Sequence, residues 1–119
     1  MPRPSNTLTG LRDALRRFAA ARDWQQFHTP KNLAMALSVE AAELLEQFQW
    51  LTPEQSARLD ARAKRAVEDE IADVMLYLTR LADVLKIDPL AAARRKIRVN
   101  ARKYPVRRAK GNARKYSHL

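Results

Sequence analysis

Two pairs of acidic residues have the type and spacing needed to hold a divalent cation. Glu40 and Glu43 are three residues apart, and Glu70 and Asp73 repeat that spacing after twenty-six intervening residues. Residues three apart share a helix face, so each pair would point two carboxylates the same way. Each pair also interrupts the apolar stripe of its segment instead of flanking it. The four carboxylates are therefore candidates for a shared, partly buried site.

Buried carboxylates need a compensating partner, because a bare one is costly unless it is paired, protonated or bound to metal. The nearest cationic candidates in the sequence are Arg65 and Arg80, and neither has a spacing that would cover two acids. Four converging carboxylates suit a hard cation with oxygen ligands, Mg²⁺ or Mn²⁺. The alternative is an ordinary solvated acidic face. Two pairs on two apolar stripes favour the metal.

The segments that carry these acids are predicted to be helices. Pro30, Pro53 and Pro89 each follow a threonine or aspartate, which is typical of an N-cap followed by proline at the first helical position. With the apolar periodicity, this predicts main helices over 7–23, 30–50, a third ending near 86, and 89–103, with a short helix at Pro53. Only two glycines occur, which disfavours strands. We expect an all-α fold, an antiparallel bundle of four main helices.

Composition excludes several kinds of site. The chain of 119 residues is expected to form one domain, and it has no cysteine, so neither a disulfide framework nor a thiolate site is available. Two histidines leave little for a histidine-based metal site. No signal peptide is expected at the N-terminus, and no apolar run approaches the ~20 residues that a membrane helix needs. We expect a cytoplasmic protein without a membrane partner.

The positive charge is concentrated near the C-terminus. The net charge is +10, and the segment from Arg94 to Leu119 has eleven Lys and Arg and no acid, whereas 1–93 has twelve basic and thirteen acidic residues. Such a segment favours an anion, and the alternative is a solvated tail. A basic nucleic-acid-binding or interaction module is therefore an alternative function, but the four acids would repel phosphate unless metal lay between, so we do not expect nucleic acid. The expected layout is a helical domain over 1–106 and a basic tail over 107–119.

The four acids, in their spacing, resemble the E-x-x-E…E-x-x-D signature of the MazG-like, all-α nucleoside triphosphate pyrophosphohydrolases. The surrounding segments are similar to the dCTP pyrophosphatase branch of that family. They are Arg22-Asp23-Trp24, Phe27-His28-Thr29-Pro30-Lys31-Asn32-Leu33, Phe48-Gln49-Trp50, Lys96…Asn100…Lys103-Tyr104-Pro105 and Lys110 to Tyr116. The resemblance covers nearly the whole chain, from about Leu11 to Tyr116. One departure is Leu15, where vertebrate members have a histidine, so that polar contact to the ligand is not carried over.

The resemblance implies a reaction and an assembly. Members hydrolyse a nucleoside triphosphate between the α and β phosphates, giving monophosphate and pyrophosphate, with Mg²⁺. We expect dCTP or a related pyrimidine deoxynucleotide as substrate, and a homotetramer or homodimer. Glu40, Glu43, Glu70 and Asp73 are then both catalytic residues and metal ligands. The sequence does not say which acid serves as general base, and Glu43 is our choice.

The remaining expected site residues would bind the nucleotide. Aromatic faces stack on bases at ~1–3 kcal/mol each, and Tyr77 lies one turn beyond Asp73, where it can face the same site. The alternative for the aromatic residues is closure of the bundle core, and for His28 a simple helix-end position. Lys96 and Asn100, one turn apart, would contact phosphates by resemblance. The expected substrate-binding set is Trp24, Phe27, His28, Lys31, Trp50, Tyr77, Lys96, Asn100 and Tyr104.

Overall fold

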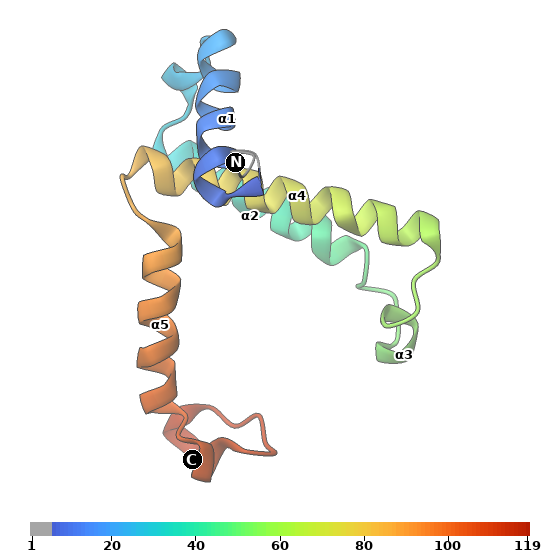
Figure 1. Ribbon diagram of the computed structural model, residues 1–119. Coiled ribbons are helices and arrows are strands. Elements are labelled where there is room, and N and C mark those ends of the chain that lie inside the picture. The colour runs from blue at the N-terminus through green and yellow to red at the C-terminus, as the bar shows by residue number, and fades with distance from the viewer. Residues whose placement is uncertain (1–5) are drawn as a thin grey trace. The chain divides into compact units, whose positions relative to one another are not determined.

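The structure, a computed structural model, describes residues 6–119, and all regular structure in that range is helical (Figure 1). The four predicted main helices are confirmed. They are α1 (Leu8–Ala21), α2 (Pro30–Glu46), α4 (Ala61–Val84) and α5 (Pro89–Lys103). The chain divides into two compact units, Met1–Lys86 and Ile87–Leu119, so α1, α2 and α4 belong to one unit and α5 to the other.

The proline-marked helix starts are also confirmed. The side chains of Thr29 and Asp88 accept hydrogen bonds from backbone N–H groups in the first turns of α2 and α5. Thr52 begins the short helix α3 (Pro53–Ser56) with a capping box, in which Thr52 and Gln55 satisfy each other's backbone N–H groups. These caps replace hydrogen bonds that the first turn of a helix cannot make internally.

The predicted end of the second helix was wrong by four residues, because α2 stops at Glu46 and not at Trp50. At Gln47 and Phe48 the backbone hydrogen bonds span three residues, and the Gln47 N–H donates to the carbonyl of Leu44 at 3.2 Å. Such tightening is common in last helical turns, where carbonyls lose their usual donors. Trp50 therefore lies in a turn beyond the helix.

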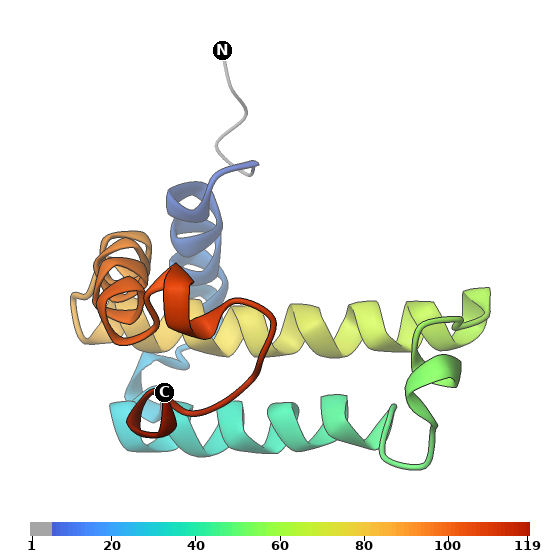
Figure 2. The same cartoon turned by 90° about the horizontal axis from the view of Figure 1, so that it is seen from below.

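The first unit is built on a pair of adjacent helices. α2 and α4 run side by side in opposite directions, and α1 lies across the C-terminal part of α4 (Figures 1 and 2). Among residues 6–119, the buried apolar side chains are few and small or medium in size. They are Ala19, Leu33, Val67 and Ala82. A core of this size gives one protomer limited burial.

Both long helices of this unit leave apolar side chains exposed. On α4, Ile71, Met75 and Leu78 follow one another at four- and three-residue spacing, and on α2 Met35 and Val39 are four residues apart. About half of each of these side chains is accessible. We refer to these five residues as the exposed apolar stripe. A monomer in water would gain by covering it, since burial of apolar area is favourable at about 25 cal/mol per Å².

The second unit has structure beyond α5. It continues through α6 (Val106–Ala109) and the 3-10 turn η3 (Tyr116–His118). The Tyr116 ring meets the edge of Tyr104 with centroids 6.0 Å apart, and the Lys103 ammonium lies 4.9 Å from the Tyr116 ring centroid. The predicted division into 1–106 and 107–119 stays a prediction. Within residues 6–119, no helix has the length and apolar character required to cross a membrane.

Candidate metal centre

Three carboxylates meet between α2 and α4. One oxygen from each of Glu40, Glu43 and Glu70 lies within 4.8 Å of the others. The antiparallel pairing of the two helices produces this meeting, since each helix presents its acids at three-residue spacing on the face toward the other. Asp73, one turn further along α4, is half-buried and lies outside the three-oxygen set, although its charge acts on both Glu40 and Glu70.

The burial of these acids is not compensated by protein groups. Glu40 Oε2 and Glu70 Oε2 are buried and accept no hydrogen bond. As expected from spacing, Arg65 and Arg80 of α4, the two cationic candidates, pair elsewhere. Arg65 lies 3.8 Å from Asp69 and Arg80 lies 3.3 Å from Asp83. Two orphaned, buried carboxylate oxygens next to a third carboxylate fit a hard divalent cation, which prefers oxygen ligands.

Glu40 and Glu70 hold protons more tightly than ordinary glutamates. Burial raises the pKa of Glu40 to about 7, and the neighbouring carboxylates of Glu43, Asp73 and Glu70 add to the increase. The pKa of Glu70 is raised by burial and then by Glu43. Like charges that cannot be solvated disfavour ionisation, so a cation at this centre would compete with protons.

The raised pKa of Glu40 predicts how the metal-free protein responds to pH. Its pKa in the fold lies above the ordinary value of 4.5, so its contribution to stability is present below that value and is lost as pH rises through about 7. In excess chelator, we expect Tm to fall more steeply between about pH 5 and about pH 8 in the unmodified protein than in Glu40→Gln. Glu54→Gln, which changes an exposed acid, should follow the unmodified protein. Parallel curves for all three proteins would contradict the prediction.

In the first unit, most of the residues predicted to bind the nucleotide lie near one of the two ends of α2. Trp24, Phe27, His28 and Lys31 lie where the 3-10 turn η2 (Gln25–Phe27) leads into α2, and Trp24 is 43% exposed. Trp50 is 87% exposed and follows the other end. The 17 residues of α2 span roughly 25 Å. One protomer therefore does not bring the two tryptophans together.

The other predicted contacts are divided between the units. Tyr77 is half-buried on α4, one turn beyond Asp73, on the side that carries the acids. Lys96 and Asn100 are exposed one turn apart on α5, and Tyr104 follows that helix as its C-cap. These three belong to the second unit, and their relation to the carboxylates stays a prediction.

A polar network near His28 was missed by the sequence analysis. Arg80 Nε donates to His28 Nδ1 at 3.1 Å, and Arg80 Nη1 donates to Asp83 Oδ2 at 3.3 Å. Arg16 Nε of α1 donates to the same Asp83 oxygen at 2.7 Å. The three-residue spacing of Arg80 and Asp83 could have indicated their pairing. Nothing in the sequence indicates that residues as distant as Arg16 and His28 join them.

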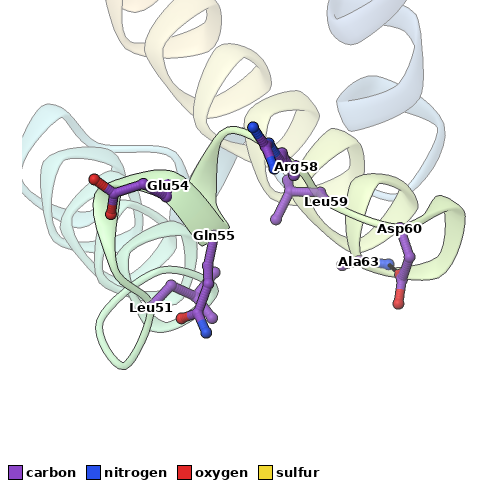
Figure 3. A pocket seen from close by; sticks show the side chains of 7 residues that line it. All are labelled: Leu51, Glu54, Gln55, Arg58, Leu59, Asp60 and Ala63. Carbon is purple, nitrogen blue, oxygen red and sulfur yellow. Dashed lines mark hydrogen bonds between the residues drawn. The ribbon is translucent and has the colours of Figure 1, made fainter.

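A hollow of about 430 Å³ lies away from the carboxylates, between the turn after α2, α3 and the start of α4 (Figure 3). Its polar groups serve local structure. Asp60 caps α4 by accepting from the Ala63 N–H at 2.7 Å, and Gln55 completes the capping box of α3. None of the predicted site residues lines it, and we do not count it as part of the site.

The fold and the site together define a class, an all-α protein in which E-x-x-E and E-x-x-D motifs on adjacent helices form an acidic centre. The chain belongs to the MazG-like family, whose sequence profile matches residues 35–119 and so includes all four acids. It is 40% identical to dCTP pyrophosphatase 1 of Homo sapiens over 98% of this chain and 69% of that protein. The bovine protein of the same name is 40% identical over 95% of this chain and 68% of its own.

A solved structure gives the same assignment. The crystal structure of a pyrophosphatase from Archaeoglobus fulgidus superimposes with a TM-score of 0.75 at 50% sequence identity. The alignment covers 78% of this chain and 87% of that one. The all-α architecture and the family assignment, both expected from the sequence, are therefore confirmed.

Proposed function

We propose that this protein hydrolyses a deoxynucleoside triphosphate between its α and β phosphates, releasing the monophosphate and pyrophosphate. The observation that carries the proposal is the meeting of Glu40, Glu43 and Glu70 between α2 and α4, with two buried oxygens that no protein donor satisfies. Membership of the MazG-like family and the relatives named dCTP pyrophosphatase 1 support the reaction class.

Mg²⁺ or Mn²⁺ is the proposed cofactor. Glu40 and Glu70 are the best ligand candidates, because their buried oxygens lack any other partner, and Asp73 is the proposed additional ligand. Such an ion, when bound, neutralises phosphate charge and lowers the pKa of a coordinated water. With Glu40 and Glu70 as ligands, Glu43 is the acid left to act as general base, at a distance that keeps it within the same centre.

The proposed substrate is dCTP or a related pyrimidine deoxynucleotide. Support comes from the relatives' names and from the exposed Trp24, Phe27 and Trp50, whose ring faces could stack on a base. Lys31, Lys96, Asn100 and Tyr104 are the proposed polar contacts, and Tyr77 is proposed to line the site beside Asp73. Leu15, half-buried on α1, offers no polar contact.

The base preference is tested by comparing kcat/KM for the four deoxynucleoside triphosphates and 5-methyl-dCTP with Mg²⁺. We expect the cytosine nucleotides to be preferred, because hydrogen bonds to the edge of a base discriminate where stacking does not. Equal kcat/KM for purine and pyrimidine nucleotides would contradict the base preference but would not contradict the proposed enzyme class.

The alternative function, nucleic-acid binding without catalysis, is favoured by the second unit alone. Residues 87–119 carry eleven Lys and Arg against the single acid Asp88, so all of the net positive charge of the chain lies there. Assays of pyrophosphate release and of DNA binding, each with and without metal, distinguish the two functions. The proposed enzyme releases pyrophosphate from dCTP only with metal, whereas the alternative requires DNA binding without metal that weakens steeply with salt.

A homodimer or homotetramer is the proposed assembly. The exposed apolar stripe gives a reason for association, because its five side chains are about half accessible in one protomer. The positions of Trp24 and Trp50 at opposite ends of α2 give a second reason. If both tryptophans contact one base, they must come from two protomers.

A further inference from the structure

His28 stands at a corner where three elements of the first unit meet. It follows η2, precedes the N-cap of α2, and accepts a hydrogen bond at Nδ1 from Arg80 Nε of α4 at 3.1 Å. Its ring meets the edge of Trp24 with centroids 6.3 Å apart. His28 is half-buried, while the neighbouring Trp24 ring is partly accessible.

The chemistry of arginine fixes the protonation of His28. A guanidinium group has only donors and remains charged, so the ring nitrogen that faces Arg80 must carry a lone pair. In the neutral imidazole, the proton is then on Nε2, which no protein group in residues 6–119 contacts by a hydrogen bond. Burial lowers the pKa of His28 from its ordinary value, and the charge of Arg80 adds to this, so the neutral form prevails.

Arg80 is itself held in place. Its side chain is 11% exposed and contacts Asp83, which is 9% exposed and is also bound by Arg16 from α1. Buried ions persist when they are paired and hydrogen-bonded, as these are. Because Arg16 remains on Asp83, loss of Arg80 alone does not leave a buried carboxylate without a cation.

We propose that Arg80 is a positioning residue that holds His28 as the Nε2–H donor, and that this donor contacts a hydrogen-bond acceptor on the edge of the base beside Trp24. The pyrimidine O2 carbonyl is such an acceptor. The base contact rests on the proposed nucleotide substrate, whereas the holding of His28 by Arg80 does not. Stacking on Trp24 alone selects poorly among bases, so a fixed donor next to it supplies what stacking lacks.

The first test is nitrogen-15 NMR of the two histidines in the full chain. The His28 signals are assigned by their loss in His28→Phe, and the exposed His118 serves as internal reference. We expect His28 to be protonated at Nε2 and bare at Nδ1, with a pKa below the ordinary histidine value. Arg80→Met should raise the pKa of His28 toward the ordinary histidine value and allow the Nδ1–H form. Arg80→Lys keeps a hydrogen-bond donor and should restore part of the His28 spectrum in which Nε2 is protonated and Nδ1 is bare. Arg65→Met, on the same helix, should leave the His28 spectrum unchanged. An Nδ1–H histidine in the unmodified protein, or an unchanged spectrum in Arg80→Met, would overturn the positioning role.

The second test concerns the base. Adding dCMP should shift the Nε2 signal of His28, and deoxyribose 5-phosphate should not. Arg80→Met and His28→Phe should each raise KM for dCTP by about three- to tenfold with kcat little changed, as expected for loss of one neutral hydrogen bond. No shift with dCMP would overturn the contact. The dCMP-induced shift of the His28 signal is measured without turnover. A protein that shows this shift but does not hydrolyse dCTP would therefore contradict the proposed function, while the contact between His28 and the base would stand.

Discussion

Glu40→Gln is expected to lower kcat for dCTP hydrolysis by on the order of 100-fold or more, and to leave the metal-free protein folded and at least as stable as before. Activity falls because glutamine keeps the shape of the side chain but loses the charge that would hold a cation. Stability does not fall, because the ionised carboxylate is buried beside Glu43 and Glu70 without a compensating donor. Glu70→Gln should behave alike for the same reason.

Thermal melting separates a lost metal site from a lost fold. Saturating Mg²⁺ or Mn²⁺ should raise Tm of the unmodified protein, since a ligand at about 100 times its Kd adds about 2.7 kcal/mol. The increase should be absent in Glu40→Gln and present in Glu54→Gln, an exposed acid outside the centre. Near-normal turnover in Glu40→Gln, or full activity of the unmodified protein in excess chelator, would be incompatible with a catalytic metal at these carboxylates.

The second large effect is expected at the exposed apolar stripe. Leu78→Asp combined with Met35→Asp should convert the assembly to monomers and abolish most hydrolysis, while each protomer keeps its helical content. Both side chains are about half accessible in the single chain, so the change introduces no charge into the protomer core. A charge without a partner in an apolar interface costs several kcal/mol, enough to prevent association at micromolar concentration.

Light scattering and circular dichroism, measured on the same samples, decide this prediction. Arg62→Asp is the matched control, because it adds an acid to an exposed position of α4 outside the stripe and should leave both mass and activity unchanged. A monomeric unmodified protein would refute the assembly. An intact assembly in the double variant would show that the stripe is not its interface.

The parts of the fold that local chemistry dictates could be predicted from the sequence. Thr29, Thr52 and Asp88 each precede a proline, and the structure uses all three as N-caps. The end of α2 could not be predicted equally well, because the change to three-residue hydrogen bonds at Gln47 depends on the geometry of the last turn and not on a marker residue. The bounds of α5 follow from Pro89 and Pro105 and agree with the prediction.

The candidate site was predictable to the extent that it depends on helical spacing. The two acidic pairs share faces by the three-residue rule, and the structure brings Glu40, Glu43 and Glu70 to one point. Spacing does not reveal that Trp24 and Trp50 lie at opposite ends of α2, since that depends on where the helix stops. It also cannot reveal that Arg80 joins His28 to Asp83 or that Arg16 binds Asp83, because those contacts cross between α1, α4 and the turn before α2.

The most direct test of the central claim is phosphorus NMR of dCTP incubated with the purified protein and Mg²⁺. Cleavage of the α–β phosphoanhydride at the carboxylate centre predicts dCMP and pyrophosphate as the first products, in equal amounts, with product formation slower by on the order of 100-fold or more in Glu40→Gln. First appearance of dCDP and orthophosphate, or equal product formation by Glu40→Gln, would contradict it.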